Sequence, residues 1–111
     1  MDFDVQTQGA DLVLRAQDSR IDAAVAVQFK DRLLSLAAGR VGRVLLDLSR
    51  VEFLDSSGLG ALVAVRRMLD GRSFELVAPT GPVLRVLRLT RMDTVFPIHP
   101  DPAVGGSGPH G

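Results

Sequence analysis

The segment that most constrains the fold is residues 43–48, which after Arg43 are branched and apolar except for Asp47. A run of this kind is typical of a central strand that is covered on both faces. It is followed by the hexapeptide DSSGLG at residues 55–60 and by an amphipathic segment that extends to about Asp70. A buried strand followed by an amphipathic helix is the basic unit of an α/β domain.

The remaining segments continue this alternation. Apolar and polar residues alternate over residues 3–7 and 12–14, on either side of Gly9-Ala10, which predicts a β-hairpin followed by a loop over residues 15–20. Helical spacing of Val25, Phe29, Leu33 and Leu36 predicts a helix over residues 23–38, with Asp22 as its cap and Gly39 as its stop. A short strand over residues 73–78, a third helix opening at residues 80–82 and a last strand over residues 94–98 complete the pattern.

This order predicts one α/β domain over residues 1–102, with helices packed on a mostly parallel or mixed sheet of about five strands. Residues 103–111 are rich in Pro, Gly and Ser and have little apolar content, so we expect a disordered tail there.

The composition excludes several classes of function. The chain has no cysteine and a formal net charge of zero, which exclude thiol chemistry and disfavour nucleic-acid binding. Its two histidines lie close to the C-terminus, so we expect no metal centre and no cofactor. Neither a secretory signal nor an apolar run of about 20 residues is present, so we expect a soluble, cytoplasmic protein that does not enter a membrane.

The hexapeptide carries more information than a simple helix start. Asp55 or Ser56 in front of an apolar-periodic segment can cap the helix, because a side-chain oxygen there accepts a hydrogen bond from a free amide. Gly58 and Gly60 each cost about 0.8–1.0 kcal/mol relative to alanine inside a helix. We therefore interpret them as leaving Ser57 unshielded, with the oxygen of Ser56 turned back to the helix and Ser57 facing outward.

The helix that follows has two distinct faces. At about 100° per residue, the core face comprises Ala61, Leu62, Val65, Met68 and Leu69. Leu59 and Val63 fall on the arc that carries two arginines and Asp70. We interpret these two residues as a small docking surface next to Ser57; the alternative is that a neighbouring loop covers them.

Catalytic interpretations of the serine are weak. No histidine lies near it in sequence, and no G-x-S-x-G motif surrounds it. A strand, a glycine-rich turn and a helix can also hold phosphate. However, the hexapeptide lacks the third glycine of a dinucleotide motif and the lysine of a P-loop, and Asp55 would repel the anion. Nucleotide binding remains open as a weak alternative.

The stretch VLLDLSRVEFLDSSGLG at residues 44–60 resembles the STAS family, in particular bacterial anti-sigma factor antagonists. Ile21-Asp22 before the first helix, and VLRVLRLT at residues 83–90 leading to Val95-Phe96, extend the resemblance over almost the whole ordered chain. The resemblance implies a single STAS-type fold.

The resemblance also implies a regulatory role without enzymatic activity. In that family an anti-sigma factor with an ATPase-like kinase fold phosphorylates the second serine of the motif, which corresponds to Ser57. The unphosphorylated protein binds this kinase and releases a sigma factor, and a serine phosphatase reverses the modification. The implied partner surface comprises Asp22, Asp55, Ser56, Gly58, Leu59 and Gly60, beside the docking residue Val63.

Two residues depart from the family pattern. Arg20 and Arg91 stand at positions where many relatives have glycine, before Ile21-Asp22 and after the third helix. Two other functions remain open at this stage. Single STAS domains also serve as accessory subunits of lipid-trafficking ABC transporters, and a weak nucleotide-binding module is the second alternative.

Overall fold

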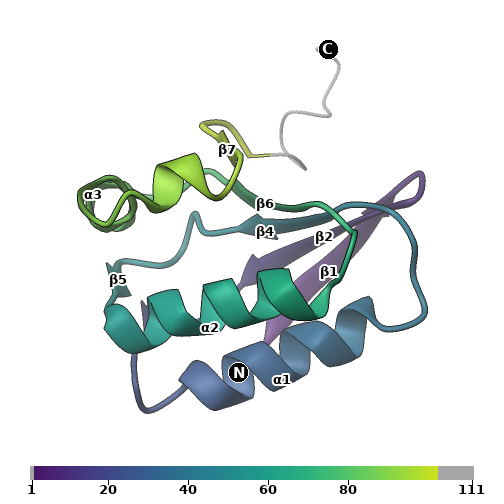
Figure 1. Ribbon diagram of the computed structural model, residues 1–111, viewed down its shortest axis with the longest axis horizontal. Helices are drawn as coiled ribbons and strands as arrows, with labels where there is room; N and C mark the ends of the chain where they lie inside the picture. Colours follow the sequence, from purple (N-terminus) through teal and green to yellow (C-terminus); the bar gives the residue numbers. More distant parts are fainter. Residues whose placement is uncertain (1, 103–111) are drawn as a thin grey trace.

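A mixed sheet forms one layer of the computed structural model, which describes residues 2–102, and the helices Ala26–Ala37 and Ser56–Met68 lie against one side of it (Figure 1). Its five strands within this range follow the order β1-β2-β4-β6-β7. They comprise β1 (Phe3–Gln8), β2 (Asp11–Ala16), β4 (Val44–Asp47), β6 (Phe74–Val77) and β7 (Ile98–His99). β1 pairs with β2 in antiparallel orientation, and the other three pairs are parallel. The predicted hairpin and the predicted α/β class are therefore confirmed.

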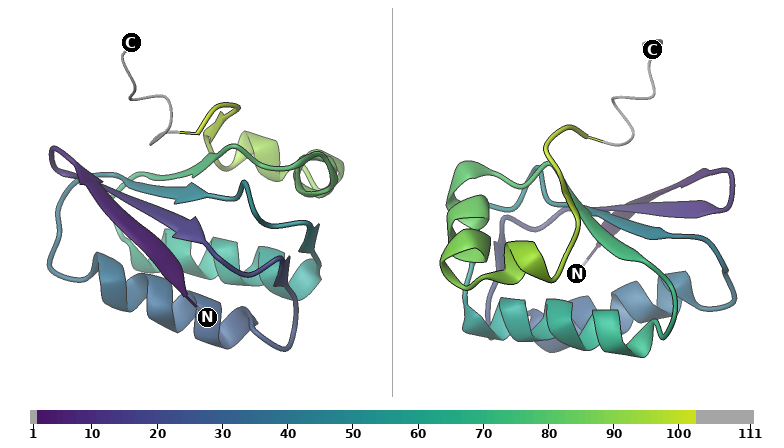
Figure 2. Two further views of the ribbon diagram at one scale, coloured as in Figure 1. Left: turned by 180° about the vertical axis from the view of Figure 1, so that it is seen from behind. Right: turned by 45° about the horizontal axis from the view of Figure 1, so that its top comes forward.

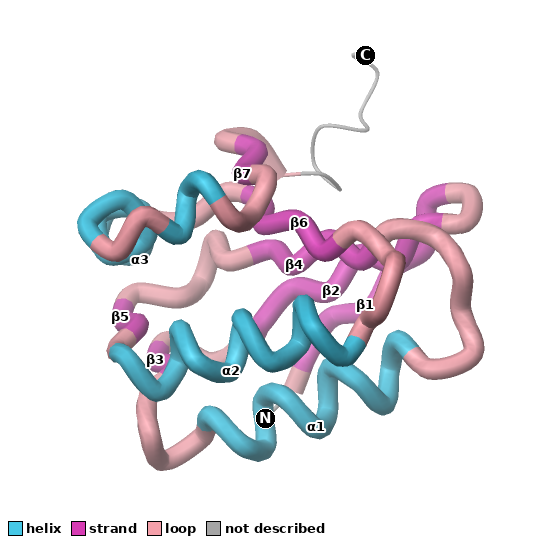
Figure 3. The backbone as a smooth tube through the Cα atoms, in the orientation of Figure 1, coloured by secondary structure: helices cyan, strands magenta, loops and turns pink. Residues whose placement is uncertain are grey.

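A second, two-stranded sheet lies apart from the main one. It pairs β3 (Arg20–Ile21) with β5 (Phe53–Leu54) in parallel, and Figure 3 shows both strands at the end where α2 begins. The expectation of a loop over residues 15–20 was thus partly wrong. Arg15 and Ala16 extend β2, and Arg20 opens β3.

Residues 2–102 also contain three helices and one 3-10 turn, which alternate with the strands along the chain: α1 (Ala26–Ala37), α2 (Ser56–Met68), α3 (Gly81–Leu89) and η1 (Met92–Thr94). α1 and α2 run side by side along the sheet, as the two views of Figure 2 also show. α3 is joined to the connection between β4 and β5 by the Thr80 hydroxyl, which donates to the Val51 carbonyl at 2.6 Å.

The main core lies between the sheet and the helices. Strand residues Leu12, Leu14 and Leu46 are fully buried there, together with Phe29 and Leu33 of α1. α2 contributes Leu62 and Val65, and α3 contributes Val83 and Leu87. Because successive residues of a strand point to opposite faces, this core uses every second strand position.

The opposite face of the sheet carries a small apolar cluster with no helix residue in it: Val13, Leu45, Val77 and Ala78. Charged side chains lie around it. Arg15 pairs with the buried Asp47 at 3.4 Å. Arg43 pairs with Asp11 at 2.8 Å and with Glu75 at 3.2 Å, and His99 lies 2.6 Å from the same glutamate. These pairs join β2, β4, β6 and β7 across their outer face.

The start of α1 and the exposure of Met68 differ from the sequence-based expectation. α1 begins at Ala26 with Val25 at its N-cap, whereas Asp22 accepts the Ala24 amide at 3.0 Å in the preceding turn. Asp22 thus shapes the turn before α1 and does not cap the helix. Met68 was expected in the core but is 60% exposed, and it lies at the rim of a surface hollow that it shares with Leu34 and Ala37 of α1.

The last strand is shorter and later than predicted. Residues 92–94 form η1, and the Phe96 amide donates to the Met92 carbonyl at 3.0 Å, so these residues cannot pair with β6. The turn begins at Arg91, whose φ of 63° is in the left-handed region. Pairing with β6 begins at Pro97, whose carbonyl accepts the Leu76 amide at 2.9 Å.

Replacing Arg91 with glycine should stabilise the fold, by up to about 1 kcal/mol. A left-handed conformation costs a residue with a Cβ about 1–2 kcal/mol, and the greater freedom of glycine in the unfolded chain offsets part of that gain. Urea unfolding of R91G measures the change. R85G, at an exposed position in the middle of α3, is the control, and its unfolding free energy should be about 1 kcal/mol lower than that of wild type. A loss of stability in R91G would contradict the assignment of strain to Arg91.

The groups paired with Glu75 (Ser73, Arg43 and His99) should make the free energy of unfolding fall at acid pH. Burial raises the pKa of Glu75, but hydrogen bonds from Ser73 and His99 and the charge of Arg43 outweigh burial and hold the pKa below its usual 4.5. The resulting stabilisation is present above pH 4.5 and is lost as the pH falls through the lower, folded-state pKa. The unfolding free energy of E75Q at pH 7 should therefore be about 1–3 kcal/mol lower than that of wild type. On acidification, the unfolding free energy of E75Q should fall less than that of wild type.

Unfolding free energies measured by urea titration at pH 7, 4.5 and 3 test this dependence. D4N is the control, since Asp4 makes no ion pair with the described part of the chain. Equal pH slopes for E75Q and wild type would show that Glu75 is not an acid-sensitive group.

Candidate functional site

The serine-containing turn begins where β5 ends. Asp55 is the N-cap of α2, with an extended backbone, and its Oδ1 accepts the Gly58 amide at 3.0 Å. Its carbonyl also accepts the Leu59 amide at 2.9 Å. Asp55, and not Ser56, therefore supplies the side-chain cap, which corrects the role expected for Ser56.

The two serines differ in exposure. Ser56 is exposed and Ser57 is half-buried, so Ser56 faces solvent more fully than the sequence suggested. Neither hydroxyl hydrogen-bonds to another residue within residues 2–102. Since Asp55 already satisfies the cap, a change at the Ser57 hydroxyl would leave the start of α2 intact.

The two glycines have different roles. A Cβ at Gly58 would lie 2.3 Å from the Ile21 carbonyl oxygen and 2.5 Å from Leu54 Cδ1. Gly58 is therefore required by the close approach of α2 to β3, which corrects the expectation that it serves to expose the serine. Gly60 is exposed and has no atom within 4 Å of its missing Cβ, so no packing contact requires glycine there.

The contact at Gly58 brings two other segments to the serine turn. Ile21 pairs with Leu54 in the small sheet, and Asp22 follows Ile21 directly. We define the serine platform as β3, β5, residues 22–24 and the first turn of α2. It places Asp22, which follows Ile21, near the first turn of α2, and the role of Asp22 in a partner surface stays a prediction.

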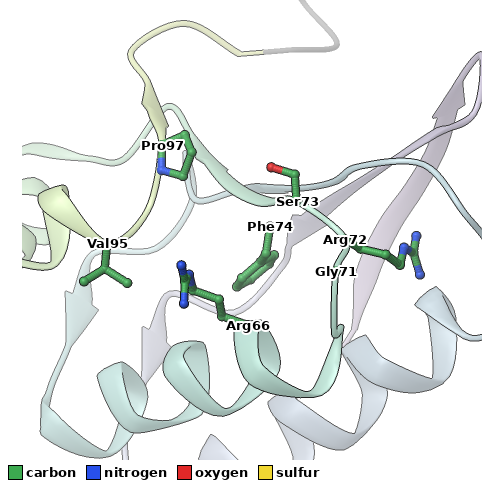
Figure 4. Close-up of a pocket in the computed structure, with 7 residues that line it drawn as sticks. All are labelled: Arg66, Gly71, Arg72, Ser73, Phe74, Val95 and Pro97. Carbon is green, nitrogen blue, oxygen red and sulfur yellow. The ribbon is translucent and has the colours of Figure 1, made fainter.

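Leu59 and Val63 line one side of α2. Both are half-buried and pack against the main core, so they are less exposed than a free docking surface would be. Helical spacing places them on the same side as Arg66. Arg66, Val95 and Pro97 border a surface hollow of about 470 Å³. Figure 4 shows the side chain of Arg66 extending between Val95 and Phe74. This side of α2 therefore faces the segment between η1 and β7.

Within residues 2–102, no histidine lies beside Ser57. His99 lies with Glu75 on the outer face of the sheet, whereas Ser57 lies on α2, which covers the inner face. His110 is outside the described range. No group of three or more metal-ligating side chains occurs within that range, and no helix there is long and apolar enough to span a bilayer.

Substitution of the two glycines by alanine should separate their roles. G58A should cost about 2 kcal/mol or more, because the added methyl group meets a backbone carbonyl that cannot move freely. G60A should stabilise the fold by about 0.5–1 kcal/mol, since alanine is the better helix former and the site is open. Thermal and urea unfolding measure both; a tolerated G58A would show that β3 can move away from α2.

The fold and the site together define a single α/β domain with helices on one face of its main sheet and a serine turn on its surface. The chain belongs to the STAS domain family, whose model matches residues 2–104. This match confirms the resemblance seen in the sequence.

Individual relatives carry related descriptions. A putative anti-sigma factor antagonist of Thermotoga maritima is 39% identical over 59 residues, which cover 51% of this chain and 52% of that protein. The alignment thus spans about half the length of this relative. The crystal structure of a putative anti-sigma factor antagonist from Thermotoga maritima has a TM-score of 0.77 at 28% identity, covering 94% of this chain and 90% of that chain.

The fold is also similar to that of SpoIIAA, a Bacillus cell fate determinant solved in its phosphorylated form. The TM-score is 0.58 at 22% identity, covering 86% of this chain and 89% of that chain. At this identity the similarity concerns the fold alone.

Proposed function

We propose that the protein is an anti-sigma factor antagonist controlled by phosphorylation of Ser57. In this proposal the unphosphorylated form binds an ATPase-like anti-sigma factor kinase and so releases a sigma factor. A serine phosphatase restores the binding form. The observation that carries the proposal is the half-buried Ser57 hydroxyl, which has no partner within residues 2–102 and lies on a helix start already capped by Asp55.

The relatives support this role. The Thermotoga maritima protein is described as a putative anti-sigma factor antagonist. SpoIIAA is described in a phosphorylated form, and this chain shares its fold. The proposed docking surface comprises the serine platform and the adjoining side of α2: Asp22, Asp55, Ser56, Gly58, Leu59, Gly60 and Val63.

The electrostatics of the site suit a switch in binding without a switch in fold. A phosphoserine adds about −1.5 to −2 charge at pH 7. At a helix N-terminus the free amides and the helix dipole tolerate that charge. In a closed interface, however, the phosphate would lie near Asp55 and Asp22 with little screening, so the same charge would weaken partner binding.

The test is phosphorylation in vitro by each ATPase-like anti-sigma kinase that the host genome encodes, with tandem mass spectrometry to locate the phosphate. We expect modification of Ser57, loss of modification in S57A, and retention in S56A. Phosphate on Ser56 would contradict the site assignment. Failure of every kinase to bind or modify the wild-type protein would contradict the function and favour a role such as a transporter accessory subunit.

Charge substitution at Ser57 tests the release mechanism. S57D should change the unfolding free energy by less than about 1 kcal/mol, because the helix dipole and repulsion from Asp55 oppose each other. Its affinity for the kinase should fall by about two decades or more, since like charges in an interface cost several kcal/mol. S57A should bind like wild type and should not be released by ATP. Tight binding by a folded S57D would contradict electrostatic release.

A further inference from the structure

Arg20 is held in a fixed position on the serine platform. Its Nε lies 3.3 Å from Asp22 Oδ2, and its guanidinium carbon lies 4.0 Å from the centroid of the Phe53 ring. Arg20 and Phe53 are register partners in the small sheet, so the backbone also fixes their separation. An aromatic face on one side and a carboxylate at one edge leave the guanidinium little freedom to turn.

This arrangement leaves the terminal amino groups of Arg20 without a partner within residues 2–102. The Arg20 side chain is 59% exposed, and Phe53, over whose ring it lies, is 38% exposed. An isolated surface ion pair contributes little to stability. Arginine and aromatic side chains are instead enriched at protein interfaces, and arginine is among the residues that contribute most to binding there.

The position of Arg20 connects it to the switch. Ile21, the next residue, pairs with Leu54, and its carbonyl lies against the first turn of α2 at Gly58. Asp22 uses Oδ1 to accept the Ala24 amide and Oδ2 to hold Arg20, so both of its carboxylate oxygens are engaged. Arg20 therefore adds the donors of a charged side chain, unpaired within residues 2–102, to the serine hydroxyls of the platform.

We propose that Arg20 is a specificity-determining residue that accepts a carboxylate of the anti-sigma kinase, with Asp22 and Phe53 as positioning residues. The proposal rests on the proposed function and names the chemistry that its partner must supply. A planar guanidinium with free terminal amino groups matches a carboxylate in a bidentate geometry, which the ammonium group of lysine cannot reproduce. A carboxylate at that point would also be neutralised by Arg20 in a region that contains Asp22 and Asp55.

The closing experiment compares kinase affinity for wild type, R20E, R20K and R40E by calorimetry at fixed salt. Arg40 is exposed and follows the C-terminal end of α1, away from the platform, so R40E is a matched charge reversal. We expect R20E to weaken binding by about 100-fold or more and R20K by about 10-fold, with R40E close to wild type. Melting temperatures show whether each variant is folded. If R20E does not fold, R20K still tests the role of Arg20.

A charge-swap screen identifies the partner group. One acidic-to-arginine substitution in the kinase should restore binding to R20E while weakening binding to wild type. Equal effects of R20E and R40E, with wild type bound and phosphorylated, would overturn the role of Arg20 and leave the proposed function standing. If R20K changed the kinase affinity of the phosphorylated protein alone, the proposed role of Arg20 would also be overturned, because Arg20 would then bind the phosphate and not a carboxylate of the kinase. Wild type bound by no kinase would overturn both proposals.

Discussion

The approach of α2 to the Ile21 carbonyl is the constraint on which the site depends. Only a residue without a Cβ fits at Gly58, because that atom would lie 2.3 Å from the carbonyl oxygen. The contact fixes the first turn of α2 against the small β3–β5 sheet. It also determines which segments share one surface: Asp22 from the turn before α1, Arg20 and Phe53 from the small sheet, and Ser57 from α2.

Different residues in the first turn of α2 serve folding and the proposed regulation. Asp55 satisfies the helix cap and Gly58 provides the close packing, so neither function uses the Ser57 hydroxyl. A charge added at Ser57 would meet a helix end that tolerates anions, in a fold that does not need the hydroxyl. A surface position that can change charge without unfolding the domain is what a reversible switch in binding requires.

The two faces of the main sheet are stabilised differently. The inner face is covered by helices and is apolar, whereas the outer face holds a small apolar cluster among ion pairs from four strands. Glu75 lies within this network and contacts both Arg43 and His99. The pairs of Arg15 with Asp47 and of Arg43 with Asp11 and Glu75 therefore join neighbouring strands on this face.

The sequence by itself determined the hairpin, the central strand, the helices and the serine turn, because their signals are local periodicity and cap chemistry. Tertiary structure alone decided the small sheet, since strands of two residues have no period and pair only through contacts between residues far apart in the chain. Tertiary structure also left Met68 exposed at the rim of a surface hollow, and the turn at Arg91 placed the last strand later in the chain than predicted. It also separated Gly58 from Gly60, which look alike in the sequence and differ only in what lies opposite their missing side chains.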